Sequence, residues 1–158
     1  MKIALLTLIF IVGVTATALA RLGENANQLV ARYGQPLSET DQKAEGDKIA
    51  QAEVVFQKGG YEIKVTITNG VSVSETYKKL NGDPLGVGEA RTLLIVNNQG
   101  HECEAPQMVD GAKLWARDDN ATAKLSEDGT SLTIKSRELT HLENVAKKLE
   151  RAPSLDGF

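Results

Sequence analysis

The chain contains few of the residues that cross-link a fold or carry out catalysis. Of its 158 residues, only one is a cysteine and two are histidines. The single cysteine, Cys103, cannot form an internal disulfide, so packing alone must hold the fold together. Aromatic residues make up 4% of the chain, and we therefore expect Tyr61, Tyr77 and Trp115 to pack in the core or at a sheet edge.

Charge and missing motifs exclude several classes of function. The formal net charge is −3, whereas a nucleic-acid partner would favour a concentrated basic face. The chain has no Gly-x-Ser-x-Gly motif for a nucleophilic serine. The segment Leu85-Gly86-Val87-Gly88 lacks the third glycine of a phosphate-binding loop. Asp118-Asp119-Asn120 lacks the glycine and the terminal glutamate of a calcium loop, so we interpret it as a turn between strands.

Residues 1–20 have the features of an export signal. Lys2 precedes an apolar run from Ile3 to Val14, and the segment ends in the small-residue pattern Ala18-Leu19-Ala20. This order is typical of a secretory signal peptide cleaved after Ala20, which predicts a secreted or periplasmic protein that begins at Arg21. A membrane anchor is the alternative, but the apolar run is shorter than the ~20 residues that a spanning helix needs.

Residues 21–151 are expected to form a single domain, and residues 152–158 a flexible tail. The centre of the domain is the stretch from Ala52 to Tyr77, in which apolar and polar residues alternate as in half-buried strands. The pair Gly59-Gly60 predicts a two-residue hairpin loop. That loop places Phe56 opposite Ile63, Val54 opposite Val65 and Ala52 opposite Ile67.

The second hairpin of this stretch allows two registers. A two-residue loop at Asn69-Gly70 would place Ile67 opposite Ser72 and Val65 opposite Ser74. A three-residue loop, Thr68-Asn69-Gly70, would place Val65 opposite Val73, with Gly70 at positive φ and Asn69 at negative φ. Because a shift of one residue exchanges the two faces of a strand, burial of the valines favours the three-residue loop.

A short amphipathic helix is predicted before this meander, from Asn25 to Tyr33. Asn25 is expected to cap its first turn, and Gln28 stands at the position that completes a capping box. Gly34 suits the residue after the helix. The polar segment from Ser38 to Lys48 is interpreted as a surface connection to the first strand.

A similar order follows in the second half. A helix from Glu89 to Asn98 precedes three predicted strands, Lys113 to Arg117, Asn120 to Ser126 and Thr130 to Ser136. The turn at Asp128-Gly129 would pair Leu125 with Leu132 and Ala123 with Ile134, beside Trp115 in the strand before. A capping box at Thr140 predicts a last helix to Glu150.

The sequence thus predicts the α+β class, with two tandem units that each contain a helix and a three-stranded antiparallel meander. The units span about residues 22–79 and 85–136, and a C-terminal helix spans about residues 141–150. Internal repetition is favoured over coincidence, but the units share few identical residues, so a true repeat stays an open question.

The first half also resembles a known family. The order of a signal peptide, Leu22-Gly23, the helix to Tyr33, Gly34-Gln35-Pro36 and a meander around Thr68-Asn69-Gly70 resembles the SmpA/OmlA (BamE-like) envelope family. That fold is shared with secreted β-lactamase-inhibitory proteins, which carry two such units. The resemblance covers about residues 22–77, and the chain lacks the family's lipidated cysteine. It implies a protein partner in the envelope or outside the cell. The start of the mature chain is also similar to that of small exported bacterial proteins of unassigned function.

One cluster suggests chemistry, the segment His101-Glu102-Cys103-Glu104. A zinc site needs three or four converging ligands, and His141 is the only other histidine, so we assign no catalytic, cofactor-binding or metal-binding residue. We therefore expect a non-enzymatic protein-binding or envelope-assembly module without a cofactor or a nucleic-acid partner. The alternative is a small secreted hydrolase or metal-dependent enzyme that uses the His101 to Glu104 loop. Convergence of His101, Cys103 and His141 on one pocket would favour that alternative.

Overall fold

A computed structural model describes residues 22–42 and 51–150. The predicted signal peptide at residues 1–20 and the predicted tail at residues 152–158 lie outside the described residues. The described part is mostly β: eight strands form one antiparallel sheet, and three helices accompany it. None of these helices has the length and apolar character needed to cross a membrane.

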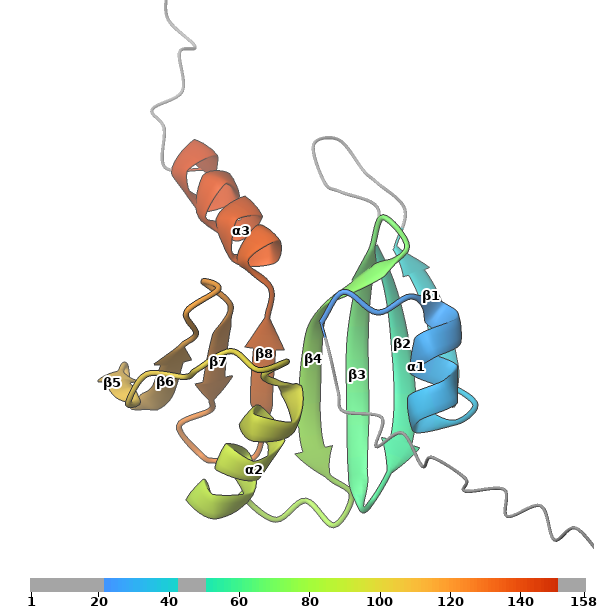
Figure 1. Cartoon of the computed structure of the whole chain (residues 1–158), viewed down its shortest axis with the longest axis horizontal. Coiled ribbons are helices and arrows are strands. Elements are labelled where there is room, and N and C mark those ends of the chain that lie inside the picture. Colours follow the sequence, from blue (N-terminus) through green and yellow to red (C-terminus); the bar gives the residue numbers. More distant parts are fainter. Residues whose placement is uncertain (1–21, 43–50, 151–158) are drawn as a thin grey trace, which may run out of the picture.

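The strands follow one another across the sheet in the order β1-β2-β3-β4-β8-β7-β6-β5 (Figure 1). The last strands of the two halves, β4 and β8, pair with each other and join the halves into one sheet. The strands are β1 (Ser38–Gln42), β2 (Gln51–Lys58), β3 (Tyr61–Thr68), β4 (Val71–Lys79), β5 (Gln107–Val109), β6 (Ala112–Ala116), β7 (Thr122–Leu125) and β8 (Leu132–Lys135).

One face of the sheet carries the core. Helices α1 (Ala26–Tyr33) and α2 (Val87–Asn97) both lie over this face, and their buried side chains join one apolar cluster with those of the strands (Figure 1). Cross-strand pairing places one row of side chains across the middle of this face: Val54, Val65, Glu75, Ile134, Ala123 and Trp115. Five of the six are apolar, so Glu75 is the exception in that row.

The neighbouring row faces the other way and is largely polar. It contains Val55, Lys64, Thr76, Thr133, Lys124 and Leu114. The first turns of α3 (Arg137–Glu150) cover one corner of this second face. There Thr140 hydrogen-bonds to Thr122, and Glu143 forms an ion pair with Lys135. Antiparallel sheets commonly keep one face on the core and one toward water, and this sheet follows that rule.

The predicted fold class is wrong. The protein is not two helix-plus-three-strand units but one eight-stranded sheet, in which each of the first two helices precedes four strands. The two strands that the sequence analysis missed, β1 and β5, are the two edges of the sheet. Edge strands pair on one side only and need little apolar alternation, so the polar segment Ser38–Gln42 gave no strand signal.

Local signals gave correct results at several places. Asn25 caps α1 in a capping box with Gln28, as predicted. The first hairpin pairs Phe56 with Ile63 and Val54 with Val65, so the two-residue loop at Gly59-Gly60 is confirmed. In the second half, the predicted pairs Leu125–Leu132 and Ala123–Ile134 are both present, and Trp115 lies in the neighbouring strand, opposite Ala123.

The predicted register of the hairpin between β3 and β4 is wrong. Asn69 and Gly70 both have positive φ, 53° and 79°, and form a two-residue turn that pairs Ile67 with Ser72. The register then shifts, because Thr66 pairs with Ser74 and leaves Val73 as an extra residue. Val65 consequently lies opposite Glu75 rather than Val73. This bulge lets the Asn-Gly pair keep its preferred tight turn while Val73 stays buried.

The last helix begins earlier than predicted. Helix α3 starts at Arg137, and the Leu139 N–H donates to Ser136 Oγ at 3.2 Å. Ser136 therefore caps the helix, whereas the predicted cap, Thr140, lies in its second turn and donates to the Ser136 carbonyl. Serine and threonine are both good capping residues. Because β8 ends at Lys135, the helix can begin directly after it, and Ser136 takes the capping position.

Candidate functional site

The structure brings His101 to the turn between β6 and β7. His101 Nδ1 lies 2.7 Å from Asp118 Oδ1, and Nε2 lies 3.8 Å from Asp119 Oδ2. Backbone pairing holds the two segments together, since the Asp118 N–H donates to the Glu102 carbonyl. Possible ligand atoms of His101, Asp118 and Asp119 lie within 4.8 Å of one another, which makes this group a candidate cation site.

Arg117 already forms an ion pair with Asp119, one of the two carboxylates of this group. Its guanidinium donates to both carboxylate oxygens of Asp119, and the Ala121 N–H donates to the same carboxylate. These hydrogen bonds, the one from Arg117 first, lower the pKa of Asp119. A metal ion at Asp119 would have to displace the guanidinium of Arg117. The arrangement therefore suits an ion pair that stabilises the fold better than a metal centre. Arg117 also donates to the Asn97 carbonyl at the end of α2, so it fastens that helix to the turn.

The other residues of the predicted reactive segment lie elsewhere. Cys103 is half-buried against the core and lines a groove beside α2. Burial raises the pKa of its thiol, which reduces the reactive thiolate. His141 lines a different cavity, next to α3. His101, Cys103 and His141 therefore do not converge on one pocket within the described residues.

A buried polar cluster lies at the middle of the core, and the sequence analysis did not find it. Glu75 on β4 is fully buried, and its Oε2 accepts hydrogen bonds from Tyr33, Tyr77 and Asn97. These donors come from α1, from β4 itself and from α2, so the carboxyl group connects both helices to the sheet. The sequence held a partial signal: Glu75 and Tyr77 are two residues apart on one predicted strand, so an inward Tyr77 implies an inward Glu75.

Burial dominates the acid-base properties of this cluster. The pKa of Glu75 is raised, because burial disfavours its ionised form more than the hydrogen bonds from Tyr77 and Tyr33 favour it. Burial also raises the pKa of both tyrosines. Glu75 Oε1 and Asn97 Oδ1 are buried without a hydrogen-bond partner among the described residues. The hydrogen bonds of Glu75 connect α1 and α2 to β4, so the cluster ties both helices to the sheet.

A groove lined largely by apolar residues lies beside α2. Its volume is about 510 Å³, and Trp115, Leu94 and Cys103 lie along it. One wall is a side of α2 on which Val87, Arg91 and Ile95 follow at intervals of four residues, and the other is the segment Cys103 to Pro106.

The helical wall of this groove is partly exposed, although Trp115 and Leu94 at its floor are buried. Ile95 on its helical wall is 58% exposed. Just beyond Pro106, Met108 is 64% exposed on β5. Large apolar side chains that gather at a groove mark an interaction site more often than scattered ones do.

One wall of the groove leads into an edge strand of the sheet. Among the described strands, β5 pairs with β6 alone, and in the segment before it the Glu104 N–H donates to the Ala116 carbonyl. All three residues of β5 are exposed. The outer side of this edge therefore offers backbone groups next to an apolar groove, while Pro106 interrupts the row of N–H donors.

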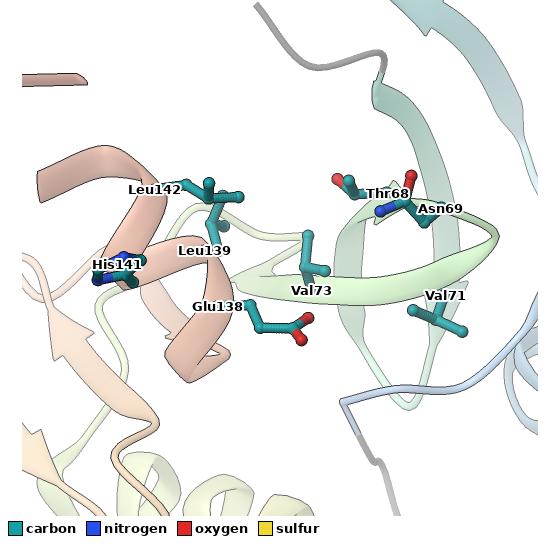
Figure 2. Close-up of a pocket in the computed structure, with 8 residues that line it drawn as sticks. All are labelled: Thr68, Asn69, Val71, Val73, Glu138, Leu139, His141 and Leu142. Atoms are coloured by element: carbon teal, nitrogen blue, oxygen red, sulfur yellow. The ribbon is translucent and has the colours of Figure 1, made fainter. Parts of the chain in front are cut away.

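A second, smaller cavity lies between α3 and the turn that joins β3 to β4. Its volume is about 290 Å³. Figure 2 shows Leu139 and Leu142 of α3 on one side, with Val73 and Val71 on the other. Glu138 and His141 stand at its border, and neither forms an ion pair with the other side of the cavity.

Comparison with known proteins identifies no family. No protein-family model matches the chain, and no curated protein matches it. One similar solved structure is a cysteine-rich secretory protein from Staphylococcus aureus subsp. aureus Mu50, with a TM-score of 0.41 and 14% identity. The match covers 75% of this chain and 45% of that protein.

These findings overturn the predicted resemblance to the SmpA/OmlA (BamE-like) and β-lactamase-inhibitory proteins. No family model matches the chain, and the similar solved structure named above carries a different description. A likeness at this TM-score carries no argument about function.

Proposed function

We propose that the protein is an exported, non-enzymatic binding module whose partner is another envelope or extracellular protein. The observation that carries the proposal is the apolar groove beside α2, one wall of which, Cys103 to Pro106, leads directly into the edge strand β5. Export to the periplasm or the medium rests on the signal-peptide pattern of Met1 to Ala20. Terminal sequencing of the exported protein should find Arg21 first, and retention of Met1 to Ala20 would contradict export.

The chemistry of this surface favours a polypeptide partner. An exposed strand edge is complemented by the N–H and C=O groups of another extended backbone. The groove beside it contains Arg91 and Glu104 as its charged residues, so it suits apolar side chains of the partner. Because β5 is only three residues long, backbone pairing adds few hydrogen bonds, and most of the affinity must come from the groove.

The enzymatic alternative has less support. A hydrolase that uses the segment His101 to Glu104 needs a nucleophile and a base within hydrogen-bond reach. His101 instead contacts Asp118, and Cys103 faces the groove with a raised pKa. The arrangement therefore supports a binding module over a catalytic one.

A peptide-selection experiment tests the proposal. Short peptides selected from a display library against the exported protein should be extended and apolar, and calorimetry gives their dissociation constants. Ile95→Asp should weaken binding at least tenfold, about 1.4 kcal/mol, because it places a charge at the wall of the groove. Leu37→Asp is the matched control, since Leu37 is also an exposed apolar residue but precedes β1 at the opposite edge of the sheet.

Two results would contradict the proposal. Peptides that bind wild type and Ile95→Asp equally well would show that the groove is not the binding site. Turnover of ester or peptide substrates that is lost in His101→Ala would establish the enzymatic alternative. Hydrogen exchange adds an independent readout, because bound peptide should protect backbone amides of β5.

A further inference from the structure

The first described residues of the chain, Leu22 to Glu24, are bound to the start of β4 by backbone hydrogen bonds. The Gly23 N–H donates to the Ser72 carbonyl at 2.7 Å, and the Ser72 N–H donates to the Glu24 carbonyl at 2.8 Å. The Glu24 N–H also donates to Ser72 Oγ, at 3.1 Å. Residues 22–24 thus form an N-terminal strap that reaches β4 from the start of α1 (Figure 1).

Side chains fix the strap as well. Gln99 Nε2, in the loop after α2, donates to the Leu22 carbonyl at 2.7 Å. The Leu22 side chain packs against the apolar core. Glu24 is 9% exposed and forms an ion pair with the buried guanidinium of Arg32 on α1. Because release of the strap would separate this buried pair, the docked position is strongly favoured in the folded chain.

The strap adjoins the predicted cleavage site of the signal peptide. In the sequence, Arg21 alone separates Leu22 from Ala20, after which cleavage is expected. Enzymes that bind a polypeptide segment commonly hold it as an extended strand. Leu22 and Gly23 form a turn instead, in which Gly23 has a φ of 87°. The docked strap therefore has the wrong shape for a peptidase that must hold the residues on both sides of the bond.

We propose that the bond between Ala20 and Arg21 is hydrolysed before the strap docks on β4, and that a chain that folds first keeps its signal peptide. The inference rests on the proposed export. In the hydrolysis, water adds across the bond, so that Ala20 receives a carboxylate and Arg21 an α-amino group. After folding, cleavage has to wait until the strap opens. The order of cleavage and docking thus decides whether the protein is released or stays joined to the apolar run from Ile3 to Val14.

Cleavage of the purified full-length precursor by a signal peptidase in detergent tests the proposal. The folded precursor should be cut roughly tenfold or more slowly than a precursor that carries Val65→Asp. That substitution places a charge at a fully buried position and prevents folding, which circular dichroism checks.

A spacer shows whether the strap causes the protection. About six glycine and serine residues between Arg21 and Leu22 move the bond away from the docked strap. The folded precursor with this spacer should be cut nearly as fast as its own Val65→Asp form. The same spacer between Gly82 and Asp83, which are both exposed, is the matched control and should leave cleavage of the folded precursor slow.

Three results would count against the proposal. Equal rates for the folded wild-type precursor and its Val65→Asp form would show that the docked strap gives no protection. A folded precursor with the spacer after Arg21 that is cut as slowly as wild type would place the protection elsewhere in the chain. If even the Val65→Asp precursor is not cut after Ala20, the predicted signal peptide itself is wrong, and the inference fails with it.

Discussion

Glu75→Gln should stabilise the protein, and increasingly so as the pH rises. The substitution keeps the size and shape of a side chain that is fully buried at the centre of the sheet. Its carbonyl can still accept from Tyr33, Tyr77 and Asn97. What the variant loses is the ability to ionise.

The magnitude follows from the linkage between protonation and folding. Below pH 4.5, the ordinary pKa of a glutamate side chain, Glu75 is protonated in both the folded and the unfolded chain, and wild type and variant should differ little. Above that pH, the unfolded chain releases its proton while the folded chain retains it, because burial raises the folded pKa. Wild type therefore loses up to about 1.4 kcal/mol of stability per pH unit until the pH passes the folded pKa. Glutamine loses none of it.

Urea unfolding at pH 4 and pH 7 measures the difference. The free energy of unfolding of Glu75→Gln minus that of wild type should be small at pH 4 and clearly positive at pH 7. Glu62→Gln on β3 is the matched substitution outside the cluster, and its difference should stay small at both pH values. A constant difference for Glu75→Gln would refute the raised pKa. A difference that falls with pH would mean that Tyr77, Tyr33 and the nearby charge of Arg32 hold Glu75 ionised.

Three further variants test other parts of the structure. Glu24→Gln should lower the free energy of unfolding by about 3 kcal/mol, because it leaves the buried guanidinium of Arg32 without its anion; an unchanged urea midpoint would contradict a buried pair. Gly70→Ala and Asn69→Ala should cause comparable losses, each about 1 kcal/mol, since both residues have positive φ. Damage from Gly70→Ala alone would instead favour the three-residue loop. Cys103 should react more slowly with iodoacetamide in the folded than in the urea-unfolded chain, because burial raises its pKa; equal rates would show an accessible thiol.

Sequence reasoning succeeded where a few neighbouring residues carry the information. The capping box at Asn25 and the hairpin at Gly59-Gly60 both depend on backbone preferences within one turn, and both are present. The same holds for the pairing of Leu125 with Leu132 across the last turn. Reasoning from burial at Asn69-Gly70 failed, because it assumed a regular register and did not allow for a bulge at Val73.

The candidate sites were harder to predict, because they join residues that lie far apart in the chain. His101 was considered with Cys103 and His141, but the structure places it with Asp118 and Asp119. The groove beside α2 depends on how Val87 and Ile95 face the segment from Cys103 to Pro106, and no spacing in the sequence fixes that angle.

By itself, the sequence determined the positions of the inner strands and of the helices, apart from the start of α3, because alternation and capping are local properties. Only the tertiary structure decided that β4 pairs with β8, that β1 and β5 form the edges, and that Glu75 is enclosed between α1 and α2. The physical reason is that a pairing between distant strands is stabilised by the whole buried face, to which every row of side chains contributes. No single segment of the chain contains all the residues whose burial stabilises that pairing.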